Sequence, residues 1–145
     1  MPLNLIKLSV GSESLEGLQD WVDRRSRERR ARGEALEHIH TTRMVPRRRD
    51  ELLDAGSIYW VIKGQIQGRQ VLTDIQPFTD SEGIGRCDLV MAPELIATEW
   101  APRRPFQGWR YLKASEAPSD LQSLGEGAAQ LPADMRRELA DLGLL

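Results

Sequence analysis

Residues 57–64 read Ser-Ile-Tyr-Trp-Val-Ile-Lys-Gly, and they set the centre of the predicted sheet. Every residue from Ile58 to Ile62 is aromatic or β-branched, so an extended strand here is apolar on both faces. Such a strand must be covered on both sides, which predicts a central position. Gly64 and Gly68 interrupt the chain before a second apolar run, Val71 to Ile75. This spacing predicts a hairpin or a bulged turn between two neighbouring strands.

Further strands are predicted on both sides of this centre. Alternating or β-rich segments lie at residues 3–10, 38–45, 86–91, 95–100 and 106–112. Residues 77–85, Pro-Phe-Thr-Asp-Ser-Glu-Gly-Ile-Gly, are rich in turn formers and are expected to form a loop.

Helices are predicted in three places. Ser14 is a suitable N-cap for a helix that continues through an arginine-rich run and ends at Gly33. Pro46 suits the first position of a short helix over residues 47–55. A third helix is predicted over residues 132–142, after a linker of small residues at 114–130.

The order of these elements indicates the fold class. After the second helix the predicted strands follow one another without helices between them, which favours consecutive antiparallel pairing. The sequence therefore predicts an α+β fold, built on a mostly antiparallel sheet or a small β-barrel with about three flanking helices. A length of 145 residues predicts a single domain over residues 1–145.

The composition limits the cellular setting. The chain is 40% hydrophobic and 29% charged, as is typical of a globular protein. Cys87 is the only cysteine, so no disulfide can form within the chain. Residues 1–10 lack the features of a secretory signal, and no run reaches the roughly 18 apolar residues of a membrane span. We expect a cytoplasmic protein with no membrane contact.

Charge is unevenly distributed along the chain. Residues 24–49 hold ten arginines against three glutamates, a net +7, whereas residues 114–145 hold six acids against two arginines, a net −4. The basic segment predicts a surface for an acidic partner, or an internal pairing of the two ends. The whole chain has a formal charge of −2, which argues against a dedicated nucleic-acid protein, because such domains are usually basic.

One candidate anion site lies at the predicted second helix. Arg47, Arg48 and Arg49 follow Pro46, where free backbone N–H groups of the helix would face an anion. The alternative is a solvated surface in which neighbouring acids pair with these arginines. The same alternative applies to the arginine run at residues 24–32.

A second candidate site lies at residues 103–111, Arg-Arg-Pro-Phe-Gln-Gly-Trp-Arg-Tyr. Forked cations interleaved with aromatic rings can contact a phosphate and stack on a base. We predict that Arg103, Arg104 and Arg110 contact the anion and that Trp109 and Tyr111 stack on a ring. The alternative is that the aromatic residues form core. Lys63 and Arg69 are expected to add further contacts.

Other reactive residue types form no complete motif. Cys87 could act as a nucleophile beside a base, but it reads as a small buried residue. His38 and His40 share one face of a strand, yet no third metal ligand follows them at a suitable spacing. We therefore predict no catalytic residue, no metal site and no cofactor.

Several segments resemble an uncharacterised protein family. They are Thr42 to Arg48, Asp50 to Leu53, Gly56 to Gly64, Asp80 to Cys87 and Arg103 to Leu112. In these stretches, and over nearly its full length, the chain is similar to short alphaproteobacterial proteins known as Domain of Unknown Function 1489. The resemblance implies a bacterial cytoplasmic context and assigns no activity or site residue. An aromatic strand followed by Lys-Gly also resembles the PUA-like group, whose members often bind RNA or modified bases, at the level of fold alone.

These observations favour a binding module for an anionic ligand, with RNA as the favoured ligand. Two alternatives stay open. One is a small enzyme that acts on an anionic metabolite through Cys87 or a carboxylate. The other is a protein-interaction subunit whose basic segment, residues 24–32, pairs with an acidic partner.

Overall fold

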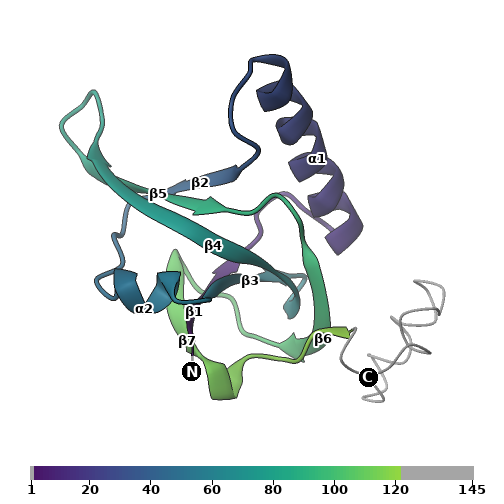
Figure 1. Ribbon diagram of the computed structural model, residues 1–145. Coiled ribbons are helices and arrows are strands. Elements are labelled where there is room, and N and C mark those ends of the chain that lie inside the picture. Colours follow the sequence, from purple (N-terminus) through teal and green to yellow (C-terminus); the bar gives the residue numbers. More distant parts are fainter. Residues whose placement is uncertain (1, 122–145) are drawn as a thin grey trace.

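A computed structural model describes residues 2–121 (Figure 1). Within this range the chain forms one mixed sheet of seven strands with two α-helices. The strands are β1 (Leu3–Leu8), β2 (His38–Thr42), β3 (Ser57–Ile62), β4 (Gln65–Thr79), β5 (Gly85–Met91), β6 (Ile96–Pro102) and β7 (Trp109–Lys113). The helices are α1 (Leu15–Ala31) and α2 (Arg49–Leu53), and a single 3-10 turn follows β7 at Ala114–Glu116.

The sheet has the order β2-β5-β4-β3-β1-β7, and β6 pairs with β4. The α+β class is confirmed. The sheet is open, however, so the alternative of a small barrel is wrong. It is also mixed, because β1 runs parallel to β3, whereas the other strand pairs among residues 2–121 are antiparallel. The crossover through α1, β2 and α2 returns the chain to β3 in the direction of β1.

Strand β4 is the longest strand and joins two parts of the sheet. Its first half pairs with β3 on one edge and with β6 on the other, and its second half pairs with β5. The loop predicted at residues 77–85 is shorter, at 80–84, because β4 runs to Thr79 and β5 begins at Gly85. Pro77 is tolerated in β4 because a strand lies on only one side of β4 there.

The predicted centre of the sheet is confirmed. All six residues of β3 are buried, and β3 lies between β1 and β4. Lys63 and Gly64 both have positive φ, 51° and 78°, and form the two-residue turn into β4. The pairing of β3 with β4 also shifts between Trp60 and Val61, so the hairpin contains a bulge as well.

Helix α1 confirms the predicted start, since the Ser14 hydroxyl accepts a hydrogen bond from Gly17 N at 3.0 Å. Helix α2 is shorter than predicted and begins at Arg49 rather than at Pro46. The N–H groups of Arg47 and Arg48 donate instead to the Tyr111 hydroxyl, at 2.9 and 3.3 Å. The predicted helix over residues 132–142 lies outside the described residues.

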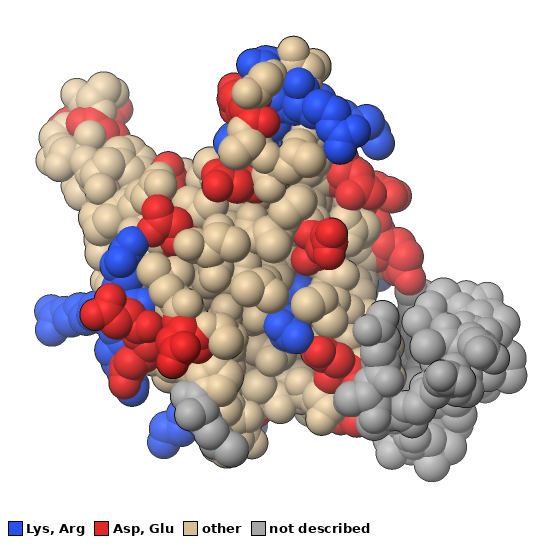
Figure 2. Space-filling model, viewed as in Figure 1, with Lys and Arg blue, Asp and Glu red and all other residues tan. Residues whose placement is uncertain are grey.

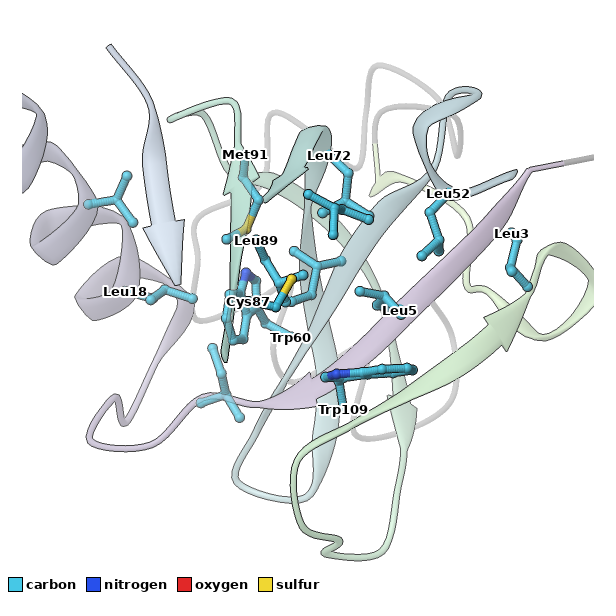
Figure 3. Close-up of a cluster of buried hydrophobic side chains, with 14 residues drawn as sticks. Leu3, Leu5, Leu18, Leu52, Trp60, Leu72, Cys87, Leu89, Met91 and Trp109 are labelled. Carbon is cyan, nitrogen blue, oxygen red and sulfur yellow. The ribbon is translucent and has the colours of Figure 1, made fainter. Parts of the chain in front are cut away.

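Two clusters of buried side chains lie on opposite faces of β1, β3 and β7. The larger cluster is enclosed by the two parts of the sheet and both helices, and includes Trp60, Cys87 and Trp109 (Figure 3). The smaller cluster comprises Ile6, Tyr59, Val61, Ile66 and Leu112. Each face of the central strand is thus buried in its own core, as the apolar run at 57–63 predicts.

Residues 114–121, predicted as the start of a linker, pack on the sheet instead. The carboxylate of Asp120 accepts two hydrogen bonds from Arg69, at 2.9 and 2.8 Å. Glu99 N donates to Ser119 O at 2.8 Å, and Asp120 forms a bridge with Thr98. The rest of the predicted linker lies outside the described residues. No helix among residues 2–121 combines the length and the apolar character needed to cross a membrane.

A buried side-chain amide, that of Gln70, lies at the point where β4 stops pairing with β3 and begins to pair with β5. Gln70 is fully buried, and its Oε1 accepts a hydrogen bond from Trp60 Nε1 at 2.9 Å. The same oxygen lies 3.0 Å from His38 Nδ1, and Gln70 Nε2 donates to Ala92 O at 2.9 Å. Gln70 thus links β2, β3, β4 and the end of β5.

Gln70→Met, which keeps the size of the side chain and removes the amide, is expected to destabilise the fold by at least about 2 kcal/mol. The indole N–H, the His38 ring and the Ala92 carbonyl would each lose a buried partner, and each such loss costs about 1–3 kcal/mol. Urea unfolding followed by circular dichroism measures the effect. Gln76→Met, at an exposed position of the same strand, is the matched control and should stay within about 0.5 kcal/mol of the parent. Equal losses in both variants would contradict the structural role of Gln70.

Candidate functional site

Strand β7 brings the two predicted arginine clusters together. Side chains alternate along it, so Trp109 and Tyr111 face the larger core, while Arg110 and Leu112 lie on the opposite face. On the first face, the guanidinium of Arg48 lies 5.6 Å from the centre of the Tyr111 ring. Arginines that are more than 60 positions apart in the sequence thus lie around one strand.

A groove lies on the other face of β7, beside the loop that joins β6 to β7. It has a volume of about 480 Å³ and is lined by Ile6, Arg103, Arg104, Phe106, Arg110 and Leu112. Tyr111 and Glu116 also border it. We call this feature the arginine groove. It gathers four of the nine predicted ligand-binding residues: Arg103, Arg104, Arg110 and Tyr111.

The arginines of the groove are held by the loop and by an aromatic ring. Arg103 N donates to Gly64 O at 2.8 Å, which fixes the loop against the β3–β4 turn. The guanidinium of Arg110 lies 5.1 Å from the centre of the Phe106 ring. The Nε of Arg103 is buried and has no hydrogen-bond partner among the described residues.

Six of the twelve other arginines among residues 2–121 form an ion pair with a carboxylate, whereas none of the groove arginines does. Arg48, Arg49, Arg69 and Arg86 each form an ion pair with a carboxylate. Within residues 2–121, no ion pair joins Arg103, Arg104 or Arg110 to an acid. Glu116 is the acid at the rim, and its carboxylate accepts a hydrogen bond from Lys113 N at 3.3 Å. The groove therefore carries an excess of positive charge that is open to a ligand.

Arg47 and Arg48 lie next to the groove strand but are not equivalent. The side chain of Arg48 donates to Glu51, and this bond raises the pKa of Arg48 and lowers the pKa of Glu51. The side chain of Arg47 is exposed. Because Glu51 pairs with Arg48, we favour the alternative that Arg48 belongs to a solvated surface. Arg47 stays a candidate contact.

The remaining predicted contacts lie elsewhere. Lys63 is exposed at the tip of the β3–β4 turn, next to the residue that anchors Arg103. Arg69 is held by Asp120 and by the Ser57 hydroxyl, at 2.8 Å, so its guanidinium is already bonded. Trp109 is only 5% exposed and donates from Nε1 to Met44 O at 2.7 Å, in agreement with the alternative that it forms core (Figure 3). Lys63 therefore stays a candidate ligand contact, whereas Arg69 and Trp109 do not.

Sequence reasoning missed five residues of the groove, namely Ile6, Pro102, Phe106, Leu112 and Glu116. Ile6 and Leu112 form its apolar floor, and Glu116 adds a carboxylate at the rim. The predicted strands place Ile6 and Leu112 on apolar faces, but nothing in the sequence says that β1 and β7 are neighbours. Glu116 falls in a segment that composition predicted as a linker.

The basic run at residues 24–32 lies on α1, where blue side chains gather in Figure 2. Arg29 and Arg32 pair with Glu34, at 3.2 and 2.7 Å. Arg24 and Arg27 border a separate hollow of about 440 Å³ beside Trp21. This arrangement keeps the protein-interaction alternative open.

Cys87 does not resemble a reactive thiol. It is fully buried in the larger core, and burial, followed by the charge of Asp88, raises its pKa. A thiol that stays protonated is a poor nucleophile. The described residues therefore offer no support for an enzyme that works through Cys87.

His38 and His40 lie inside the curve of the sheet. Within residues 2–121, no group of three or more His, Cys, Asp or Glu side chains could hold a metal ion. The His40 ring packs edge-on against Trp60, with 5.8 Å between centres. Burial, followed by the charges of Lys7 and His38, lowers the pKa of His40 to about 4. Burial also lowers the pKa of His38. Both rings are thus held in the neutral form.

Taken together, the fold and the groove define an α+β protein with an open, mixed sheet and an arginine-lined surface groove. The chain belongs to the family described as protein of unknown function (DUF1489), whose model matches residues 5–145. No curated protein and no solved structure matches the chain. The family resemblance seen in the sequence is thereby confirmed. The alphaproteobacterial origin and the PUA-like likeness stay predictions.

The neutral histidines predict a loss of stability in acid. The pKa of His40 in the folded state, about 4, lies below its unfolded value near 6.5, so the unfolded state binds the proton more readily between these values. The stabilising contribution is complete above pH 6.5 and is lost as the pH falls towards 4. At 1.36 kcal/mol for each pKa unit, the loss is at most about 3 kcal/mol.

His40→Asn removes this titration, and the comparison with the parent isolates it from the carboxylates that titrate nearby. The free energy of unfolding should fall less steeply between pH 6.5 and pH 4 in the variant than in the parent. Urea unfolding at a series of pH values measures both slopes. Parallel profiles would show that His40 is not held neutral by the fold.

Proposed function

We propose that the protein is a binding module for an anionic ligand, and that this ligand is RNA. The observation that supports the proposal is the meeting of Arg103, Arg104 and Arg110 in one groove, where no carboxylate of residues 2–121 forms an ion pair with them. Guanidinium groups that are available beside an aromatic ring suit a phosphate backbone with stacked bases. A cytoplasmic location is part of the proposal, because the only cysteine is a free thiol buried in the core.

The ligand would contact the groove from the loop side. Arg103 and Arg104 would meet phosphate oxygens, and Arg110, supported by Phe106, would offer a flat cationic surface for a base. Tyr111 borders the groove and Lys63 lies next to Gly64, which holds Arg103, so both would add contacts to neighbouring phosphates. A single strand fits this description better than a duplex, because only an unpaired base can reach a ring.

The double variant Arg103→Ala, Arg104→Ala is expected to weaken binding of a labelled single-stranded RNA of mixed sequence. Each phosphate that the variant no longer neutralises should reduce the slope of log affinity against log salt by about 0.7, the value for a single strand. Fluorescence anisotropy across a range of salt concentrations measures both the affinity and the slope.

Arg24→Ala with Arg27→Ala is the matched control, because it removes the same charge from α1. Thermal melts of both variants establish that the fold is kept. Unchanged affinity and slope in the groove variant would overturn the proposal. A loss confined to the α1 variant would move the RNA site to α1 and overturn its assignment to the groove.

A further inference from the structure

The arginine groove has a charge that discriminates between kinds of phosphate. Three guanidinium groups and one carboxylate, that of Glu116, border it, which leaves a net charge of +2. A phosphodiester inside a strand carries one negative charge, whereas a phosphate monoester carries about −1.5 to −2 at neutral pH. The charge of the groove therefore matches a monoester more closely than a diester.

Arg103 adds a forked donor to the groove. Its backbone N–H is fixed by Gly64 O, and no ion pair occupies its guanidinium within residues 2–121. The two Nη groups of a guanidinium bind oxygens of one phosphate or carboxylate in a fork. A terminal phosphate has three free oxygens and can satisfy this fork while it also meets Arg104.

The floor of the groove is apolar, which a free phosphate would not need. Ile6 and Leu112 are almost completely buried beneath it, and Phe106 packs against the same cluster. Arg110 covers the Phe106 ring at 5.1 Å and offers its own plane for stacking. A ligand that uses both parts of the groove must join a planar ring to a phosphate.

The size of the groove limits how much of the ligand it holds. Pockets for small ligands range over about 300–1,000 Å³, and the groove, at about 480 Å³, lies in the lower part of this range. This space suits one nucleotide rather than several.

We infer that the arginine groove binds a single nucleotide that carries a phosphate monoester, with the phosphate on Arg103 and Arg104 and the base against Arg110 and Phe106. The inference rests on the proposed function and names the part of the ligand that the site selects. The nucleotide is either a phosphorylated end of an RNA strand or a free nucleoside monophosphate, since both present the same group.

The test compares one short RNA oligomer in three forms, with a 5′-phosphate, with a 3′-phosphate, and with hydroxyl groups at both ends. We expect one phosphorylated form to bind at least about tenfold more tightly than the hydroxyl form, a difference of about 1.4 kcal/mol. Arg103→Lys keeps the charge but removes the forked guanidinium, so it should reduce the preference below about threefold. Arg24→Lys on α1 is the matched control and should leave the preference unchanged.

Competition separates the two sources of the nucleotide. A mixture of nucleoside monophosphates should displace the phosphorylated oligomer at lower concentration than inorganic phosphate or nucleosides do. Equal affinity for all three oligomers would overturn the inference and leave the RNA proposal standing. Binding of the monophosphates without binding of any oligomer would overturn RNA as the ligand and retain the nucleotide site. Binding of neither would overturn both.

Discussion

The amide of Gln70 holds the sheet together at the point where β4 changes partners. Before this residue β4 lies between β3 and β6, and shortly after it β4 pairs with β5 alone. A strand that leaves one neighbour for another creates a bend, and a bend brings polar groups into the interior. Gln70 satisfies the Trp60 indole, the His38 ring and the Ala92 carbonyl at once. Because each of these belongs to a different part of the chain, the curvature of the whole sheet relies on one buried network.

The bend in the sheet encloses the larger core. Strand β7 lies at an edge of the sheet, outside this bend. Trp109 fills the core from this edge, and its neighbours in the strand reach the surface on both sides. Tyr111 extends the link, because its hydroxyl accepts the N–H groups of Arg47 and Arg48 and delays the start of α2. The arginine groove is thus a consequence of the way in which β7 is anchored.

Charge pairing separates the structural arginines from the available ones. Arg69 is bonded to Asp120 and Ser57 and closes residues 114–121 onto the sheet. Arg86 and Asp80 fasten the β4–β5 turn in the same way. The arginines of the groove share its rim with one acid, Glu116, whose carboxylate is bonded to the backbone. Within residues 2–121 no ion pair offsets their positive charge.

Much of the secondary structure could be predicted from local chemistry. The strand at 57–63, the Ser14 cap and a hairpin after that strand depend on residues that are close in sequence, so they were predicted correctly. The second strand of the hairpin nevertheless begins at Gln65, six residues before the predicted Val71. Residues whose conformation depends on distant partners were not. Arg47 and Arg48 were expected in a helix and are held outside it by Tyr111, and residues 114–121 were expected in a linker and are tied down by Arg69 and Glu99.

In the candidate site, too, local sequence predicted some features and distant contacts decided the others. The residue types at 103–111 indicated an anion and a ring, because guanidinium and aromatic groups carry that chemistry wherever they lie. Which of them line the groove depended on packing across the sheet, which buried Trp109, occupied Arg69 and left Arg103, Arg104 and Arg110 beside an apolar floor. Composition and short spacings therefore predicted which residue types form the candidate site. Contacts between distant segments, which no local pattern encodes, decided which of those residues line the groove.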